Sequence, residues 1–248
     1  MPFHQSWRPF PLDHILGSLE ACVKSVCDNG SKRIQHIAFA DDCFTPDVQF
    51  AADVLTATTE IFPQVRPHIE GRVRDLLRPG VLEHMASTNV QNIGVGVECG
   101  YSSGLRKISK GLRIEEVEEL GRRAKALGMG DALYYSYIVG FPWETSVEMK
   151  KTIDFAFSVA SRYGGFVQIC WWMTMPGSRL FKQMCDTHGL DASIFDLRKW
   201  WFDRDVFLKT HPTLNMDEIR EVCDYSISVA SSNKQIRKAG SAFWDGLG

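Results

Sequence analysis

Five short apolar segments alternate with longer amphipathic segments along most of this 248-residue chain. The short segments have the length and the β-branched and aromatic content of buried strands, whereas the longer ones carry apolar residues at helical spacing. We predict strands over residues 34–40, 65–70, 92–98, 132–139 and 165–172. Strands that alternate with helices form parallel sheets with right-handed crossovers, so the sequence predicts an α/β fold.

Helices are predicted between and after these strands, and several carry recognisable ends. The predicted ranges are 12–26, 47–62, 81–87, 114–127, 145–162, 178–188 and 216–231. Thr45 or Asp47 suits the start of the second helix, and Thr145 suits the start of the fifth. Gly128 and Gly130 favour a stop after the fourth helix, because glycine readily adopts the left-handed conformation at helix ends.

Composition excludes some classes of partner. A formal net charge of −2, with 44% hydrophobic and 23% charged residues, is typical of a globular domain and offers no general attraction to nucleic acid or an anionic membrane. The sequence has no apolar stretch of membrane-spanning length, and its first residues lack a secretory signal pattern. We therefore expect a cytoplasmic protein that acts on a small-molecule substrate.

Seven cysteines are spread along the chain, at positions 22, 27, 43, 99, 170, 185 and 223. Their odd number and wide spacing argue against a disulfide framework. No three of them have the Cys-x-x-x-Cys-x-x-Cys spacing, and the five-residue separation of Cys22 and Cys27 points their side chains apart on a helix. We expect most of them to be small buried apolar residues.

Polar residues and glycines follow the predicted strands. They are Asp41 and Asp42, Glu70 and Arg72, Glu98, and Gly140. Ligands of parallel α/β proteins bind at the carboxyl ends of the strands. There Glu98 can accept hydrogen bonds from ribose hydroxyls or an amine, Gly140 lets a ring approach the backbone, and Arg72 can pair with a ligand carboxylate. Each of these residues also has a purely structural interpretation. Asp41 or Asp42 would cap a helix, Gly140 would be a turn glycine, and Glu70 would form a salt bridge with Arg72.

A set of motifs in a fixed order resembles one known superfamily. The segments are Ile37-Ala38-Phe39-Ala40-Asp41-Asp42-Cys43-Phe44, Glu70-Gly71-Arg72-Val73, Gly94-Val95-Gly96-Val97-Glu98, Leu105 to Gly111, Tyr137-Ile138-Val139-Gly140-Phe141-Pro142-Trp143-Glu144-Thr145, and Met175-Pro176-Gly177-Ser178. Together they resemble the radical S-adenosylmethionine (radical SAM) superfamily, and most nearly its members related to cobalamin-binding proteins. The resemblance covers roughly residues 7–184.

The resemblance implies a fold and a set of cofactor-binding residues. The fold would be a partial (β/α)6 TIM-like barrel over residues 1–190, with its first strand missing, and a helical and aromatic extension over 191–248 that packs on the barrel. The cofactor-binding residues would be Asp41, Asp42, Arg72, Glu98, Lys110, Tyr137, Gly140 and Phe141. We expect Asp42, Glu98 and Gly140 to converge on one opening shaped for an adenosyl group.

The implied activity is S-adenosylmethionine binding for reductive cleavage to a deoxyadenosyl radical. The superfamily uses a 4Fe-4S cluster for this step, and its three cysteine ligands are absent from this sequence, so we expect the cluster loop upstream or lost. Cobalamin would come only through an upstream domain. The alternative is a non-catalytic barrel that serves as a nucleoside-binding or partner subunit, with a second chain supplying the missing strand. A rebuilt cluster site at Cys43, Cys99 and Cys170 is a third hypothesis.

Overall fold

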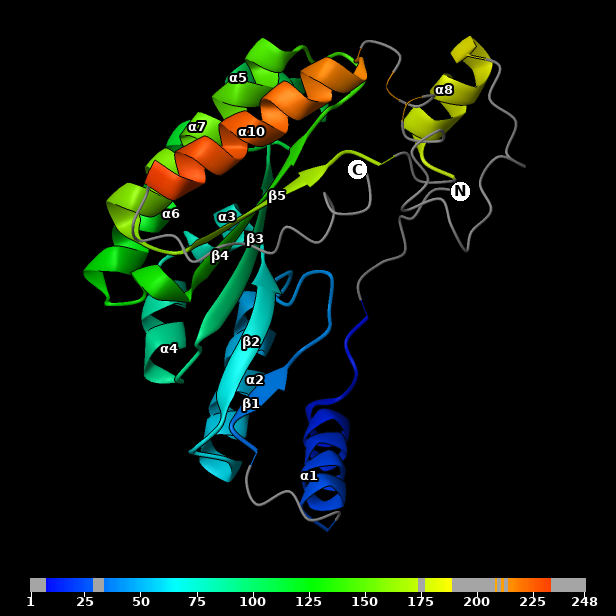
Figure 1. Cartoon of the computed structure of the whole chain (residues 1–248). Coiled ribbons are helices and arrows are strands. Elements are labelled where there is room, and N and C mark those ends of the chain that lie inside the picture. The colour runs from blue at the N-terminus through cyan, green and yellow to red at the C-terminus, as the bar shows by residue number, and fades with distance from the viewer. Residues whose placement is uncertain are drawn as a thin grey trace.

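A five-stranded parallel sheet forms the centre of the molecule, and its strands follow one another in chain order (Figure 1). This structure is a computed structural model, and it describes residues 8–28, 34–173, 177–188, 208, 211 and 214–232. The strands are β1 (His36–Ala38), β2 (Arg66–Gly71), β3 (Asn92–Glu98), β4 (Leu133–Val139) and β5 (Phe166–Trp171). The predicted α/β fold with a parallel sheet is confirmed.

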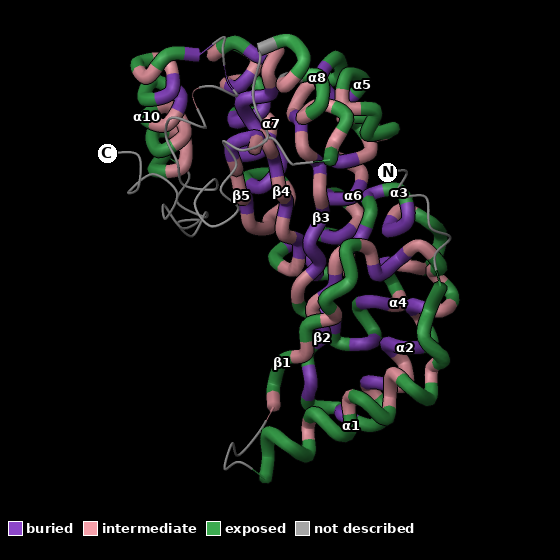
Figure 2. Tube along the Cα trace, turned by 90° about the vertical axis from the view of Figure 1, so that its right-hand side faces the viewer, coloured by how far each residue is buried: buried purple, intermediate pink, exposed green. Residues whose placement is uncertain are grey.

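Helices connect the strands and cover one side of the sheet (Figures 1 and 2). They are α1 (Leu12–Asp28), α2 (Val48–Ile61), α3 (Val73–Leu76), α4 (Val81–Ser87), α5 (Ser102–Lys107), α6 (Ile114–Ala126), α7 (Ser146–Tyr163), α8 (Arg179–His188) and α10 (Met216–Ser232). Helices α2, α4, α6 and α7 form the layer behind the strands, and α10 packs against α7 from outside.

The predicted helix ends are present. Asp47 caps α2, where its side chain accepts hydrogen bonds from the backbone N–H groups of Gln49 and Phe50 at 3.0 and 3.1 Å. Thr145 begins α7 in a capping box with Glu148. Gly128, with a φ of +74°, follows α6 in the left-handed conformation that only glycine adopts without cost. Local sequence therefore sets where these helices start and stop.

The apolar core lies on the helical side of the sheet. Along β4, Leu133, Tyr135, Tyr137 and Val139 are buried, while the residues between them are half-buried. Successive strand residues point to opposite faces, so the half-buried set lies on the other side, which we call the inner face. The sheet thus has one apolar face that packs on helices and one face with more polar side chains.

Three predicted features differ from the structure. The first strand is shorter than predicted because β1 pairs with a single neighbour, β2, among the described strands. Helices α3 and α5 were not predicted, since four and six residues are too few to show a helical period. The expectation that most cysteines are buried is wrong: Cys99 is buried, but Cys22 and Cys27 are exposed on α1 and the other four are half-buried.

The predicted aromatic segment at 191–214 lies almost wholly outside the described residues. The last predicted helix is present as α10, where Ile219 and Val222 are buried and the Tyr225 hydroxyl donates to Asp154 Oδ1 of α7 at 2.6 Å. The division into a barrel and an extension stays a prediction. Within the described part of the chain, no helix has the length and apolar character needed to cross a bilayer.

Candidate functional site

Side chains of four neighbouring strands meet on the inner face. Strand pairing aligns Glu70 of β2 with Gly94 of β3, Gly94 with Tyr134 of β4, and Ile138 of β4 with Cys170 of β5. Aligned residues of parallel strands point to the same face. A carboxylate, a phenol and a thiol therefore line one side of the sheet.

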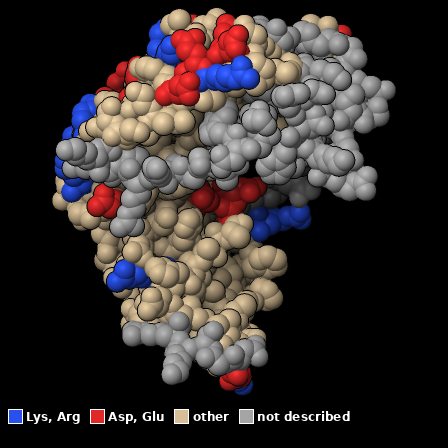
Figure 3. Space-filling model, in the orientation of Figure 1, with Lys and Arg blue, Asp and Glu red and all other residues tan. Residues whose placement is uncertain are grey.

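Two glycines of β3 make room for two carboxylates. A Cβ atom at Gly94 would lie 2.1 Å from Glu70 Oε2, and one at Gly96 would lie 2.5 Å from Glu98 Oε1. Contacts this short are impossible, so the glutamate side chains lie flat across the glycine backbone. Acidic side chains gather near the middle of the view in Figure 3, in the region where the loops after β1 and β2 lie in Figure 1, with basic side chains beside them.

Glu98 ends β3 in a strained conformation. Its φ is +73°, in the left-handed region that residues with a Cβ rarely adopt. The N–H of Cys99 donates to the carbonyl of Val97 at 3.0 Å, which closes a three-residue γ-turn around Glu98. The pairing of β3 with β4 also shifts register between Gly96 and Glu98. The turn and the bulge together aim the Glu98 side chain back over Gly96.

Lys110 is the basic partner of Glu98. Its Nζ donates to Glu98 Oε1 at 2.8 Å, and the side chains of Lys110 and Glu98 are 33% and 22% exposed. The structure thus brings together two of the residues predicted for the site. An ion pair at this exposure contributes less than about 1 kcal/mol to stability, so its main effect is to orient the carboxylate.

Gly140 directly follows β4, at a position where no residue with a Cβ atom fits. Its φ is +82°, and a Cβ atom there would lie 2.5 Å from the Trp171 ring. The next residue, Phe141, is buried and stacks on Trp143 with ring centroids 5.0 Å apart. Glu98 pairs with Tyr137, three positions before Gly140, so Glu98 and Gly140 both lie toward the carboxyl ends of two neighbouring strands.

Glu144 is a buried residue that the sequence reasoning did not include in the site. Its Oε2 accepts the backbone N–H groups of Gly140 and Phe141 at 2.7 and 3.0 Å, and its Oε1 accepts the Tyr101 hydroxyl at 2.8 Å and lies 3.8 Å from Cys99 Sγ. Burial raises the pKa of Glu144, and these donors act in the opposite direction. The sequence did contain a signal for this residue, because Glu144 is the acidic residue of the motif that begins with Gly140-Phe141-Pro142.

The other predicted residues lie on another face of the sheet or in other loops. Tyr137 is buried on the helical side, where its ring meets Phe155 of α7 edge-on with centroids 6.3 Å apart and burial raises the pKa of its hydroxyl. Its side chain is therefore turned away from the inner face. Asp41 and Asp42 are exposed in the loop after β1, which is separated from β3 by β2. Arg72 is exposed after β2.

The loops after β1 and β2 are connected by backbone hydrogen bonds. The N–H of Phe44 donates to the Glu70 carbonyl at 2.7 Å, and the N–H of Arg72 donates to Thr45 Oγ1 at 3.4 Å. The alternative salt bridge between Glu70 and Arg72 is not formed: in the described residues, Glu70 lies 3.6 Å from His68 Nε2. The Arg72 side chain is thus not held by Glu70.

The cysteines do not fit an iron–sulfur cluster. All seven are described and are free thiols, and nowhere in the described ranges do three or more His, Cys, Asp or Glu residues form a group that could hold a metal. Cys99 Sγ faces Glu144 within the core, and burial raises its pKa to about 12, so it stays a neutral thiol. The hypothesis of a rebuilt cluster at Cys43, Cys99 and Cys170 is therefore wrong.

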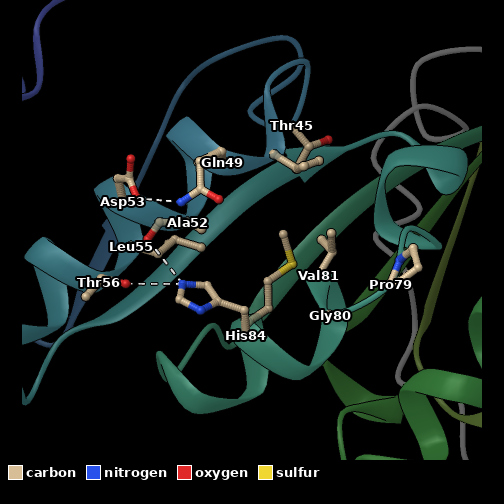
Figure 4. Close-up of a pocket in the computed structure, with 13 residues that line it drawn as sticks. Thr45, Gln49, Ala52, Asp53, Leu55, Thr56, Pro79, Gly80, Val81 and His84 are labelled. Carbon is tan, nitrogen blue, oxygen red and sulfur yellow. Dashed lines mark hydrogen bonds between the residues drawn. The ribbon is translucent and has the colours of Figure 1, made fainter.

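A cavity lies in the helical layer, away from the candidate site (Figure 4). It has a volume of about 340 Å³ between α2 and α4. His84 Nε2 lies 3.2 Å from Thr56 Oγ1 and 3.1 Å from the Ala52 carbonyl, so the ring nitrogen carries the proton there. None of the predicted site residues lines this cavity.

Comparison with known proteins identifies the fold. No family model matches the chain. An uncharacterized methyltransferase of Pyrococcus horikoshii is 25% identical over 182 residues, which are 73% of this chain and 37% of that protein. The radical SAM methyltransferase TsrM of Kitasatospora setae, solved with cobalamin and a 4Fe-4S cluster, aligns with 91% of this chain and 49% of its own at a TM-score of 0.57 and 13% identity.

A third similar protein is OxsB, a cobalamin-dependent radical SAM enzyme solved with aqua-cobalamin and S-adenosylmethionine. It aligns with 61% of this chain and 23% of its own, with a TM-score of 0.53 and 21% identity. This chain therefore has the partial-barrel fold of radical SAM enzymes, and the resemblance predicted from its motifs is confirmed. It spans less than half the length of each of these three relatives.

Proposed function

We propose that this chain is the S-adenosylmethionine-binding core of a radical SAM enzyme, with its ligand at the carboxyl ends of β3 and β4. One observation carries the proposal: a strained glutamate, Glu98, lies over the backbone of Gly96 at the end of β3, next to the strand that Gly140 follows. Strain of this kind costs about 1–3 kcal/mol and is concentrated at binding and catalytic sites. The shared fold of radical SAM enzymes supports the same location.

Each residue of the proposed site has a chemical role. The Glu98 carboxylate accepts hydrogen bonds from ribose hydroxyls or from the ligand amine, and Lys110 holds it in place. The Gly140 backbone lets the adenine ring approach closely, next to the apolar Phe141. Arg72 pairs with the ligand carboxylate, and Asp41 and Asp42 lie at the rim. The site binds and orients the ligand by these contacts.

Reductive cleavage of the sulfonium needs an electron, which an iron–sulfur cluster would supply. The cysteines of this chain do not gather into a site for one. No cleavage step is therefore assigned to its residues. This observation favours a second candidate function, in which the chain binds a nucleoside ligand as a partner subunit and leaves the redox chemistry to another segment or chain.

Equilibrium dialysis with labelled S-adenosylmethionine tests the proposed site. We expect the wild-type chain to bind, and Glu98→Gln to bind about tenfold or more weakly, because a hydrogen bond to a charged group is lost. Glu115→Gln, on the exposed surface of α6, is the control and should bind like the wild type. Absence of binding by the wild-type chain, or equal affinity of Glu98→Gln, would contradict the proposal.

Anaerobic incubation with iron and sulfide separates the two candidate functions. The core of a radical SAM enzyme, once supplied with a segment that carries the three cluster cysteines, would retain iron and release 5′-deoxyadenosine when a reductant is added. A binding subunit would bind S-adenosylmethionine with unchanged affinity, retain no iron above the level of a cysteine-free control protein, and release no deoxyadenosine.

A further inference from the structure

Three consecutive residues after Glu98 are anchored to the next strand–helix unit. Cys99 Sγ lies 3.8 Å from Glu144 Oε1, the N–H of Gly100 donates to Thr152 Oγ1 at 3.1 Å, and the Tyr101 hydroxyl donates to Glu144 Oε1 at 2.8 Å. Thr152 belongs to α7, and Glu144 precedes it in the loop after β4. The loop after β3 is therefore held by the loop and helix that follow β4.

Glu144 also holds its own loop. The same carboxylate accepts the N–H groups of Gly140 and Phe141 through its other oxygen. One buried side chain thus bridges the two strand ends that form the proposed site. We call Glu144, Tyr101 and Cys99, with the two N–H groups, the Glu144 network.

Donors surround the Glu144 carboxyl group on both of its oxygens. Every partner is an N–H, O–H or S–H donor, and an ionised carboxylate is the side chain that only accepts. The hydroxyl of Tyr101 remains protonated because burial, and then the charge of Glu144, raise its pKa. An amide in place of Glu144 would turn its own N–H groups toward one pair of donors, and the bridge would break on that side.

Close packing makes the anchoring specific. A Cβ atom at Gly100 would lie 2.6 Å from the Thr152 Cα atom, so the loop touches the α7 backbone directly. The strained turn at Glu98 immediately precedes this contact. A strained conformation persists only where the contacts around it hold it in place. Each of the three residues after Glu98 makes such a contact.

We propose that Tyr101 and Glu144 are a positioning pair, which fixes the Glu98 carboxylate relative to the Gly140 backbone and so sets the geometry of the ligand site. The inference rests on the proposed function for its effect on ligand affinity, but the coupling between the two loops is a property of the free chain. Neither residue contacts the ligand in this proposal. Both act through Glu98 and Gly140.

Hydrogen exchange of the ligand-free chain tests the coupling. In Tyr101→Phe we expect amide exchange to rise about tenfold or more in both loops, residues 97–104 and 138–145, because the hydroxyl donor to a charged group is lost. The matched control is Tyr225→Phe, which removes a hydroxyl–carboxylate bond of 2.6 Å between α10 and α7. It should leave both loops unchanged. Faster exchange confined to residues 97–104 would overturn the inference.

Ligand affinity tests the consequence through a double-mutant cycle. Tyr101→Phe should weaken S-adenosylmethionine binding about threefold to tenfold in the wild-type background and have a smaller effect in Glu98→Gln, because part of its effect passes through Glu98. Equal effects in both backgrounds would contradict a positioning role. If the wild-type chain binds no S-adenosylmethionine, the proposed function fails, while the exchange experiment still decides whether the loops are coupled.

Discussion

At the scale of single residues, Glu98 is where local conformational preference and the fold disagree. Three described residues other than glycine have a positive φ, and the other two, Asn89 and Ser109, lie in turns after helices. Glu98 instead terminates a central strand, with its side chain on the inner face. The surrounding anchors stabilise a conformation that the residue itself disfavours.

This strain predicts an unusual order of stability among variants. Glu98→Gly should be about 1 kcal/mol more stable than Glu98→Ala in urea denaturation, because both lose the Lys110 pair but glycine adopts a positive φ without cost. At Lys151, within α7, the order of the same two substitutions should be reversed. Lys151→Gly should be about 1 kcal/mol less stable than Lys151→Ala, because glycine disfavours the helix. Equal stability of the two Glu98 variants would show that the turn relaxes when the side chain is shortened.

Sequence reasoning identified some site residues and missed others for physical reasons. Glu98 and Gly140 were predictable because they end neighbouring buried strands, and Lys110 because of its motif. Tyr137 lies two positions before Val139, the last residue of β4, so its side chain points to the same helical face as Val139, which strand alternation alone would have indicated. Glu144 was missed because burial of an acid depends on donors from a loop more than 40 residues away.

At the scale of elements, strand and helix positions followed the apolar pattern closely. Four of the five strands lie within one residue of their predicted limits, since buried parallel strands are continuous apolar runs. The short helices α3 and α5 were not predictable, because their position depends on contacts with α6 and with the core rather than on periodicity.

The capping box of α7 predicts a pH dependence. The hydrogen bonds from the side chain and then the N–H of Thr145 lower the pKa of Glu148 below its ordinary value of 4.5. Its contribution to stability is therefore present above that value and is lost as the pH falls through the folded-state pKa. In urea denaturation from about pH 6 to about pH 3.5, Glu148→Gln should lose less stability than the wild type.

The control for this experiment is Glu20→Gln, at an exposed position of α1. Its stability should follow the wild type over the whole pH range. If Glu148→Gln and the wild type lose stability in parallel, the carboxylate does not contribute to the helix start through its charge.

At the scale of the whole molecule, packing is uneven from one end of the sheet to the other. Helix α1 has no buried residue and contacts α2, and β1 has three residues at the edge of the sheet. By contrast, β4 lies between two strands and alternate residues along it are buried. The order of the parallel strands was predictable from the chain, whereas this gradient of packing was not, because it depends on which faces meet.

The gradient predicts the order of local opening. In native-state hydrogen exchange, amides of α1 and β1 should exchange at free energies well below that of global unfolding, whereas those of β3 and β4 should exchange only near it. Exchange of α1 as slow as that of β4 would mean that α1 is stabilised by contacts that its exposure does not reveal.

The separation of an apolar helical side from a polar inner face has an evolutionary consequence. Tyr134, Ser136, Gln168 and Cys170 contribute little to the buried core, so core packing places few constraints on their identities. Mutational drift can therefore explore new chemistry on that wall of the sheet without eroding the scaffold behind it.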